Sequence, residues 1–248
     1  MKLTNNIVLI TGGASGIGAT MAERFKNMGN TVIICGRNKE KLAQAASTMG
    51  VDSVICDISS PEQCQSMLNT ISKNHGRLDI LVNCAGVMFA YDFANDLDTA
   101  TKIQTEIEIN AIAPLQLTHA ALPLLKQSKA PAIVFVSSGL AYVSYFATPA
   151  YSGSKALIHH SAQALRHQLK PHGIQVFELL PPITDTPMAE GMNTGHFKKM
   201  APSAVIDELI NGMQTGKVEI AAGASKQLHF MSRLAPNFLF KQMVKSFT

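Results

Sequence analysis

The chain has 248 residues, of which 46% are hydrophobic and 15% are charged, and its formal net charge is +4. This length is enough to bury a full core, and the composition excludes an intrinsically disordered chain. The basic residues are scattered, with no block of five like charges, which argues against nucleic acid as a partner.

The first residues, MKLTNNIVLITGG, contain an apolar run that is too short for a secretory signal. No stretch approaches the ~20 apolar residues of a membrane-spanning helix, so we expect a cytoplasmic protein. The cysteines include no C-x-x-C pair and no nearby His-x-x-x-His, which predicts buried free thiols and no metal site. They are Cys35, Cys56, Cys64 and Cys84.

Short β-branched runs alternate with amphipathic stretches along the chain. The runs cover 7–11, 31–35, 53–57, 78–83, 132–137 and 174–180, and the stretches cover 16–28, 39–48, 61–74, 100–127 and 152–170. The runs are apolar throughout, as in parallel strands that helices cover on both faces. This pattern predicts an α/β fold: a doubly wound, Rossmann-type parallel sheet in a single domain over residues 1–248.

The chain changes character after residue 180. Residues 181–203 are rich in Pro, Gly, Thr and Met without a clear period, and we expect them to form a substrate loop. A helix at 203–214 and a short strand at 217–221 are predicted next. The tail at 222–248 is apolar and basic, which leaves three roles open: covering the sheet, packing on another subunit, or touching a membrane surface.

Two sets of side chains in the expected substrate loop each allow two interpretations. The methionines fit an adaptable lid over an apolar ligand or an ordinary mobile loop. The basic side chains fit contacts with an acidic substrate or a solvated patch. These residues are Met188, Met192 and Met200, and His196, Lys198 and Lys199.

A glycine-rich stretch, VLITGGASGIG, places Gly12, Gly16 and Gly18 between the first strand and the first helix. Glycine allows a sharp turn and a close approach of phosphate to the backbone, and the helix N-terminus then faces the anion. The spacing therefore predicts a dinucleotide site, with a simple tight turn as the alternative.

The end of the second strand indicates which nucleotide is bound. Gly36 stands where NAD-preferring proteins of this fold have an acidic residue, and Arg37 follows it. A carboxylate would repel the 2′-phosphate of NADP, whereas a guanidinium can bind it through two hydrogen bonds. The sequence favours NADP(H) over NAD(H), and the alternative is an exposed Arg37 without a ligand.

Five motifs, in the same order, resemble those of the short-chain dehydrogenase/reductase family over nearly the whole chain. They are TGGASGIG (11–18), VICDIS (54–59), NCAG (83–86), EIN (108–110), and VSSGLAY (136–142) with AYSGSK (150–155). The resemblance implies the catalytic residues Asn110, Ser138, Tyr151 and Lys155. It also implies cofactor contacts from Thr11, Gly12, Ser15, Gly16, Ile17, Gly18, Arg37, Asp57, Ile58, Asn83, Ala85, Gly86, Tyr151, Lys155, Pro181, Thr184 and Thr186.

Further implications follow from the same resemblance. Family members commonly form homo-oligomers, so we expect a homodimer or homotetramer with contacts through 100–127 and 152–170. The stretches SGLAY and PPITDT also resemble a subgroup associated with teichoic-acid D-alanylation gene clusters. The chain departs from the family at Pro182, where a glycine is usual, and at Cys84, where a second asparagine is usual.

Tyr151 and Lys155 are four residues apart, so on a helix they point the same way. Lowering the pKa of a phenol from ~10 to ~7 takes about 4 kcal/mol. An ammonium at ~4 Å supplies ~1 kcal/mol in water but ~4 kcal/mol at an effective dielectric constant of ~20. We therefore expect Lys155 to make Tyr151 more acidic only inside a dry cleft.

In the resulting hypothesis, Tyr151 exchanges a proton with a carbonyl oxygen while NADPH delivers hydride to the carbon. Ser138 hydrogen-bonds the same oxygen. As the resemblance implies, Lys155 also holds the nicotinamide ribose and Asn110 positions a water. The alternative from another class is an NADP(H)-binding sensor or regulator that keeps the fold without turnover.

Four further side chains near these motifs remain open. Tyr142 and Tyr145 fit either a substrate pocket or ordinary packing. For His159 and His160, a place on the helix surface or at a subunit interface is favoured over a catalytic role.

Overall fold

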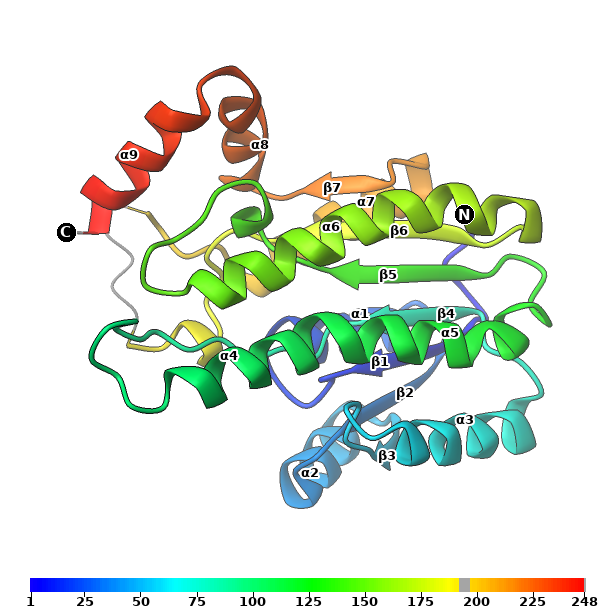
Figure 1. Cartoon of the computed structure of the whole chain (residues 1–248). Helices are drawn as coiled ribbons and strands as arrows, with labels where there is room; N and C mark the ends of the chain where they lie inside the picture. Colours follow the sequence, from blue (N-terminus) through cyan, green and yellow to red (C-terminus); the bar gives the residue numbers. More distant parts are fainter. Residues whose placement is uncertain (192–196, 248) are drawn as a thin grey trace.

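The computed structural model describes residues 1–191 and 197–247. Its centre is a seven-stranded parallel sheet in the order β3-β2-β1-β4-β5-β6-β7 (Figure 1). The strand order reverses between β1 and β4, so the loops that follow them diverge and leave a crevice at this edge of the sheet. The strands are β1 (Ile7–Thr11), β2 (Thr31–Gly36), β3 (Asp52–Ile55), β4 (Ile80–Asn83), β5 (Ala132–Val136), β6 (Gln175–Leu180) and β7 (Glu219–Ala221). The predicted doubly wound α/β fold is confirmed.

Helices cover both faces of the sheet. Because side chains of a strand point alternately to its two faces, Val8 and Ile10 of β1 enter one core and Ile7 and Leu9 enter the other. The first core is closed by α1 (Gly16–Asn27), α2 (Lys39–Met49) and α7 (Pro202–Thr215), and the second by α3 (Pro61–His75), α5 (Ala113–Leu125) and α6 (Pro149–Leu169). The edge strand β3 differs from the prediction, since most of its residues are exposed.

The stretch predicted as one helix over 100–127 contains three parts. Helix α4 (Thr99–Ile107) runs into a π-helical turn (Glu108–Ile112), and α5 follows it. The wider turn leads into Pro114, which has no amide hydrogen to donate to the preceding turn. A π-helical turn often marks a functional position, and this one contains Asn110.

The C-terminal tail forms two helices that the sequence did not predict, α8 (Ser225–Leu234) and α9 (Pro236–Phe247). They lie beyond the carboxyl ends of β5, β6 and β7 (Figure 1). Leu239 and Met243 of α9 are buried. The tail therefore covers the edge of the sheet where its strands end. Within the part of the chain that the structure describes, no helix has both the length and the apolar character to cross a bilayer.

In the described residues of the expected substrate loop before α7, 181–191 and 197–201, the structure has a short 3₁₀ turn (Pro187–Ala189) and a bridge that pairs Thr184 with Met200. Met192 and His196, which the sequence singled out, lie outside the described residues.

Candidate active site

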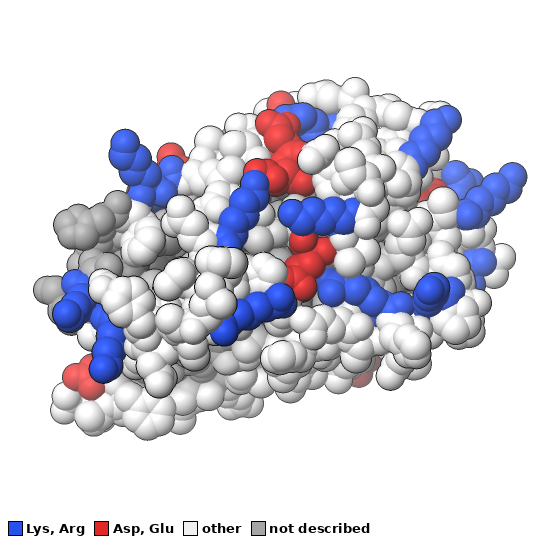
Figure 2. All heavy atoms as spheres, turned by 90° about the horizontal axis from the view of Figure 1, so that it is seen from above, with Lys and Arg blue, Asp and Glu red and all other residues white. Residues whose placement is uncertain are grey.

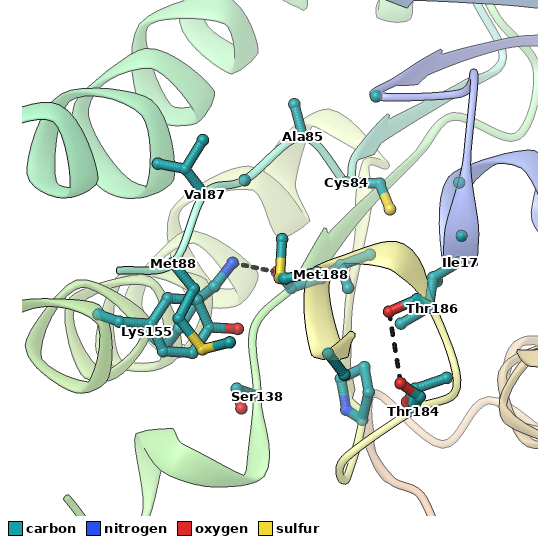
Figure 3. A pocket seen from close by; sticks show the side chains of 18 of the residues that line it. Ile17, Cys84, Ala85, Val87, Met88, Ser138, Lys155, Thr184, Thr186 and Met188 are labelled. Atoms are coloured by element: carbon teal, nitrogen blue, oxygen red, sulfur yellow. Dashed lines mark hydrogen bonds between the residues drawn. The ribbon is translucent and has the colours of Figure 1, made fainter. Parts of the chain in front are cut away.

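A cavity of about 360 Å³ opens at the carboxyl edge of the sheet, over the crevice between β1 and β4 (Figure 3). Its walls come from the loops that follow β1 to β6, and from α6, α8 and α9. Most of the predicted site residues line it: Gly12, Ser15, Gly16, Ile17, Gly18, Arg37, Asp57, Ile58, Ala85, Gly86, Ser138, Tyr151, Lys155, Pro181, Thr184 and Thr186. The buried side chains of Thr11, Asn83 and Asn110 stand behind this lining.

The glycine loop has the shape that a bound phosphate requires. Gly12 has a φ of +67°, and a Cβ at this position would come within 2.9 Å of Ala85 Cα. A Cβ on Gly18 would lie 2.4 Å from the Gly12 carbonyl oxygen. Ser15 precedes α1 without a side-chain capping bond, and the first turn has no acidic residue. The first amides of α1 and its dipole therefore suit an anion, as the phosphates of a dinucleotide would supply.

Thr11 ties the end of β1 to the segment after β4. Its hydroxyl accepts hydrogen bonds from the amides of Cys84 (2.9 Å) and Ala85 (3.0 Å). At position 84, where the family usually has asparagine, the thiol has a pKa that burial raises to about 11. The neighbouring Asn83 amide donates to the Thr118 hydroxyl at 3.0 Å. The Cys84 side chain takes part in none of these contacts, which hold this wall of the cavity through Thr11, Asn83 and Thr118.

Arg37 and Asp57 stand together at one end of the cavity. The Arg37 guanidinium lies 4.0 Å from the Asp57 carboxylate, and its side chain is 58% exposed. Partial burial of Asp57 is outweighed by hydrogen bonds from Ser59 and by Arg37, which keep the pKa of this carboxyl below its usual value. Arg37 is thus a cation whose side chain remains accessible to a ligand.

Tyr151 and Lys155 lie on the first two turns of α6, where both side chains are buried. Lys155 Nζ is 5.6 Å from the centre of the Tyr151 ring and donates to the Val136 carbonyl oxygen at 3.0 Å (Figure 3). Burial raises the pKa of the Tyr151 phenol to about 12, against a hydrogen bond with Ser138 that lowers it. Burial also lowers the pKa of Lys155 to about 8.

These shifts differ from the expected acidification of Tyr151. Removal from water disfavours the phenolate as well as the ammonium. The residues of the chain bring the two groups together in a dry place, but by themselves they do not make the phenol acidic.

Asn110 clamps the segment that follows β4 onto α6. Its side-chain oxygen accepts from the Val87 amide at 2.8 Å, and its nitrogen donates to the Val87 carbonyl at 2.8 Å and to Ser154 Oγ at 3.2 Å. A Cβ at Gly86 would lie 3.1 Å from Asn110 Oδ1 and 3.6 Å from Lys155 Nζ. Asn110 therefore holds the segment that follows β4 in place beside Lys155.

Glu106, four residues before Asn110, is a buried carboxylate that the sequence did not single out. Its Oε1 accepts from the Phe89 amide at 2.7 Å. Burial raises the pKa of this carboxyl, and the backbone amides of Phe89 and Tyr151 partly offset that rise. The Tyr91 hydroxyl accepts from the Ala150 amide at 3.2 Å. Side chains from outside α6 thus face the amides of its first turn, whereas Thr148 at the N-cap forms no capping bond.

The end of the cavity beyond Ser138 and Tyr151 is apolar. Figure 3 shows Met88 and Met188 close to this end, and Leu140, Tyr145, Leu228 and Met243 also line it. Tyr145 therefore belongs to the pocket.

Among the basic residues of the loop, Lys198 lines the cavity and Lys199 lies 4.0 Å from Asp185. Met200 packs beside Gly223, away from the cavity lining.

Tyr142 and His159 lie outside the cavity, in a separate polar cluster. The Tyr142 hydroxyl donates to Glu219 at 2.7 Å, and its ring stacks on His229. His159 is buried against Glu178, with 2.9 Å between its Nδ1 and the nearer carboxylate oxygen, so its expected place on the helix surface was wrong. His160 is exposed, as expected.

In the described part of the chain, His159, Glu178 and Glu219 form the one group with metal-ligand spacing. The Glu178 carboxylate already accepts from Ser137 Oγ at 2.6 Å and lies 3.4 Å from Arg166. Protein groups therefore balance its charge.

Comparison with known proteins decides the family. A sequence profile for short chain dehydrogenases matches residues 6–197. The chain belongs to this family. It is 34% identical, over 98% of both chains, to the uncharacterized oxidoreductase DltE of Bacillus subtilis. That similarity agrees with the narrower subgroup resemblance drawn from SGLAY and PPITDT.

Solved short-chain dehydrogenases share the fold over nearly the whole chain. One from Burkholderia cenocepacia, in complex with NADP, has a TM-score of 0.86 and 25% identity, covering 98% of this chain and 99% of its own. Another from Burkholderia phymatum, in complex with NAD, has a TM-score of 0.86 and 19% identity, covering 98% and 96%. The chain is thus an NAD(P)-dependent oxidoreductase, and these structures set no preference between the two cofactors.

Proposed function

We propose that this dehydrogenase interconverts a carbonyl and an alcohol, with Tyr151 exchanging a proton with the substrate oxygen. One observation carries the proposal: the Ser138, Tyr151 and Lys155 side chains share one wall of a cavity whose other end is formed by the glycine loop. When bound there, the nicotinamide supplies or accepts the hydride at carbon. A pure nucleotide binder has no need of the buried phenol and ammonium.

Each side chain of this wall has a separate task. The Ser138 hydroxyl, which hydrogen-bonds the phenol, is placed to bind the same substrate oxygen and stabilise its developing charge. Lys155, held by the Val136 carbonyl beside Gly86, is placed to bind the nicotinamide ribose. Asn110 keeps the segment around Gly86 in position and orders the water that links Lys155 to solvent. A filled cavity excludes more water, which strengthens the effect of the ammonium on the phenol.

The preferred cofactor is NADP(H). Arg37 is accessible at the end of the cavity, and Gly36 before it offers no carboxylate to repel a 2′-phosphate. The guanidinium can pair with the 2′-phosphate of NADP, whereas the 2′-hydroxyl of NAD carries no charge for it to neutralise.

The substrate is a carbonyl compound with an apolar group, because apolar side chains surround the end of the cavity next to Ser138. In this arrangement residues 1–248 form one catalytic domain of a cytoplasmic enzyme. Residues 181–203 supply the substrate loop, and 222–248 complete the wall. The exposed side chains of Ile112, in the π-helical turn, and Leu157, on α6, favour homodimer or homotetramer contacts through 100–127 and 152–170.

Steady-state NADPH consumption with a panel of aldehydes and ketones tests the proposal. Tyr151→Phe should lower kcat by roughly 10²–10⁴-fold and leave the Kd for NADPH nearly unchanged. Tyr142→Phe removes a hydroxyl outside the cavity and should keep most of the turnover. If the wild-type protein binds NADPH yet reduces no carbonyl and oxidises no alcohol, the sensor or regulator alternative replaces the enzyme.

A further inference from the structure

The charge of the chain is concentrated in its C-terminal segment. Residues 220–248 contain no Asp or Glu and include Lys226, Arg233, Lys241 and Lys245. Since the whole chain has a formal charge of +4, the rest is neutral overall. Lys226 pairs with Glu208. For Arg233, Lys241 and Lys245, no carboxylate of the described residues lies within ion-pair distance.

The same segment exposes large apolar side chains. Phe230 and Leu234 on α8 are 63% and 66% exposed, and Phe238 and Phe240 on α9 are 55% and 44% exposed. Both helices have a second face, which carries Leu228 and Met243 and lines the cavity. Packing against the rest of the chain therefore does not explain the apolar side chains on the outer face of these helices.

The position of the two helices makes this outer face accessible to a large surface. They project beyond the carboxyl ends of the strands, at one end of the molecule (Figure 1). In Figure 2 that end, on the left, shows several basic side chains, fewer acidic ones and a large uncharged surface. Two more exposed apolar side chains, Phe146 and Met188, lie on loops that follow β5 and β6 at the same edge.

Two surfaces could cover such a face. A second copy that met it across a two-fold axis would bring two sets of positive charges together, with no carboxylate from 220–248 to balance them. An anionic bilayer offers partners for both kinds of side chain: its acyl chains can bury Phe and Leu, and its phosphates can pair with Lys and Arg. Charge complementarity favours the bilayer.

We propose that the exposed face of α8 and α9 is a peripheral binding surface for anionic lipid bilayers. The helices lie on the membrane without crossing it, with Phe230, Leu234 and Phe238 at the boundary between headgroups and acyl chains. Leu228 and Met243 of the same helices line the cavity, so docking brings the cavity close to the lipid. An apolar substrate dissolved in the bilayer then has a short path to the site.

Co-sedimentation of the full chain with vesicles tests the proposal. The protein should bind vesicles that contain phosphatidylglycerol and phosphatidylcholine, and the bound fraction should fall as salt is raised. Vesicles of phosphatidylcholine alone should bind at least tenfold less. Lys241→Gln with Lys245→Gln should weaken binding at least fivefold, whereas Lys126→Gln with Lys129→Gln, which removes two exposed charges at the far end of α5, should not.

A second pair of variants tests the apolar contribution. Phe238→Ser should weaken binding at least fivefold, and Ile55→Ser, which removes an exposed apolar side chain from β3 at the opposite edge of the sheet, should leave it unchanged. Retained NADPH binding shows that each variant is folded.

Two results overturn the proposal. One is equal binding to both kinds of vesicle, or binding to neither. The other is a wild-type protein that binds no vesicles together with a Phe238→Ser variant whose molar mass, measured by light scattering, is lower than that of the wild type. In that case a second copy of the chain covers the face. Turnover of soluble carbonyl compounds needs no vesicles, so neither result bears on the proposed function.

Discussion

Gly139 lies so close to Ser225, the first residue of α8, that a Cβ added at residue 139 would come within 2.4 Å of Ser225 Oγ. Leu228, one turn further along α8, would be 3.1 Å from the same Cβ. Because Gly139 directly follows Ser138, the position of α8 is tied to the hydroxyl proposed for catalysis. A helix outside the range of the family profile is thus packed against the turn that carries a proposed catalytic side chain.

Gly139→Ala should push α8 away from the cavity. An added methyl group in a packed site usually costs about 1–3 kcal/mol of stability, and the displaced Leu228 should raise KM for apolar carbonyl compounds severalfold. The Kd for NADPH should change little, because the glycine loop is at the other end. Gly153→Ala on α6, where a Cβ meets open space, is the matched control and should leave stability unchanged or raise it. Equal KM values in both variants would show that Leu228 does not contact the substrate.

Lys155→Met should abolish turnover and yet stabilise the fold at neutral pH. Burial lowers the pKa of Lys155 from 10.5 to about 8, so folding is penalised while the ammonium is protonated. The penalty is fully present below pH 8 and disappears as pH rises toward 10.5, where the unfolded chain also loses the proton. It amounts to about 3 kcal/mol at most. Urea unfolding should therefore show a gain that is largest at pH 7 and shrinks above pH 8, and a gain independent of pH would contradict this origin.

Arg37→Ala should weaken NADPH binding about tenfold or more, because a charge-assisted hydrogen bond contributes about 1.5–3 kcal/mol. NADH has no 2′-phosphate, so its affinity should stay within twofold. Lys41→Ala, which removes an exposed cation on the next helix, separates a specific contact from a general loss of positive charge. Fluorescence titration with both cofactors measures the effect. An equal loss for NADH and NADPH would take Arg37 out of cofactor selection.

The sequence predicted those parts of the molecule that depend on short-range patterns. The buried strands read as continuous apolar runs, and the glycine spacing after β1 reports the close approach of Gly12 to Ala85. The spacing of Tyr151 and Lys155 places both side chains on one side of α6. Each of these patterns is contained in a few consecutive residues.

Contacts between distant segments could not be predicted in the same way. His159 reads as a surface residue until Glu178, on β6, is known to lie against it. Nothing in the tail indicates that Leu228 and Met243 reach the cavity, because their partners come from loops far back in the chain. Glu106 looks like an ordinary charged residue on an amphipathic helix, and its burial follows only from how α4 packs beside α6.

Glu106→Gln should move the pH dependence of turnover to lower pH. The charge of Glu106 raises the pKa of the nearby Tyr151 phenol, whose other neighbours include Ser138 and Cys84. Removing that charge lowers the phenol pKa, so the limb of the rate profile that follows Tyr151 shifts toward acid in both reaction directions. The glutamine oxygen can still accept from the Phe89 amide, which keeps the packing.

Tyr91→Phe is the matched control for this shift, because it removes an uncharged group from the same helix terminus. Its hydroxyl accepts from the Ala150 amide, so the loss should lower stability by about 1 kcal/mol. No charge changes near Tyr151, and the pH profile should stay in place. If Glu106→Gln moves the profile no more than Tyr91→Phe does, the carboxylate acts on α6 only as a structural cap and has no influence on proton transfer.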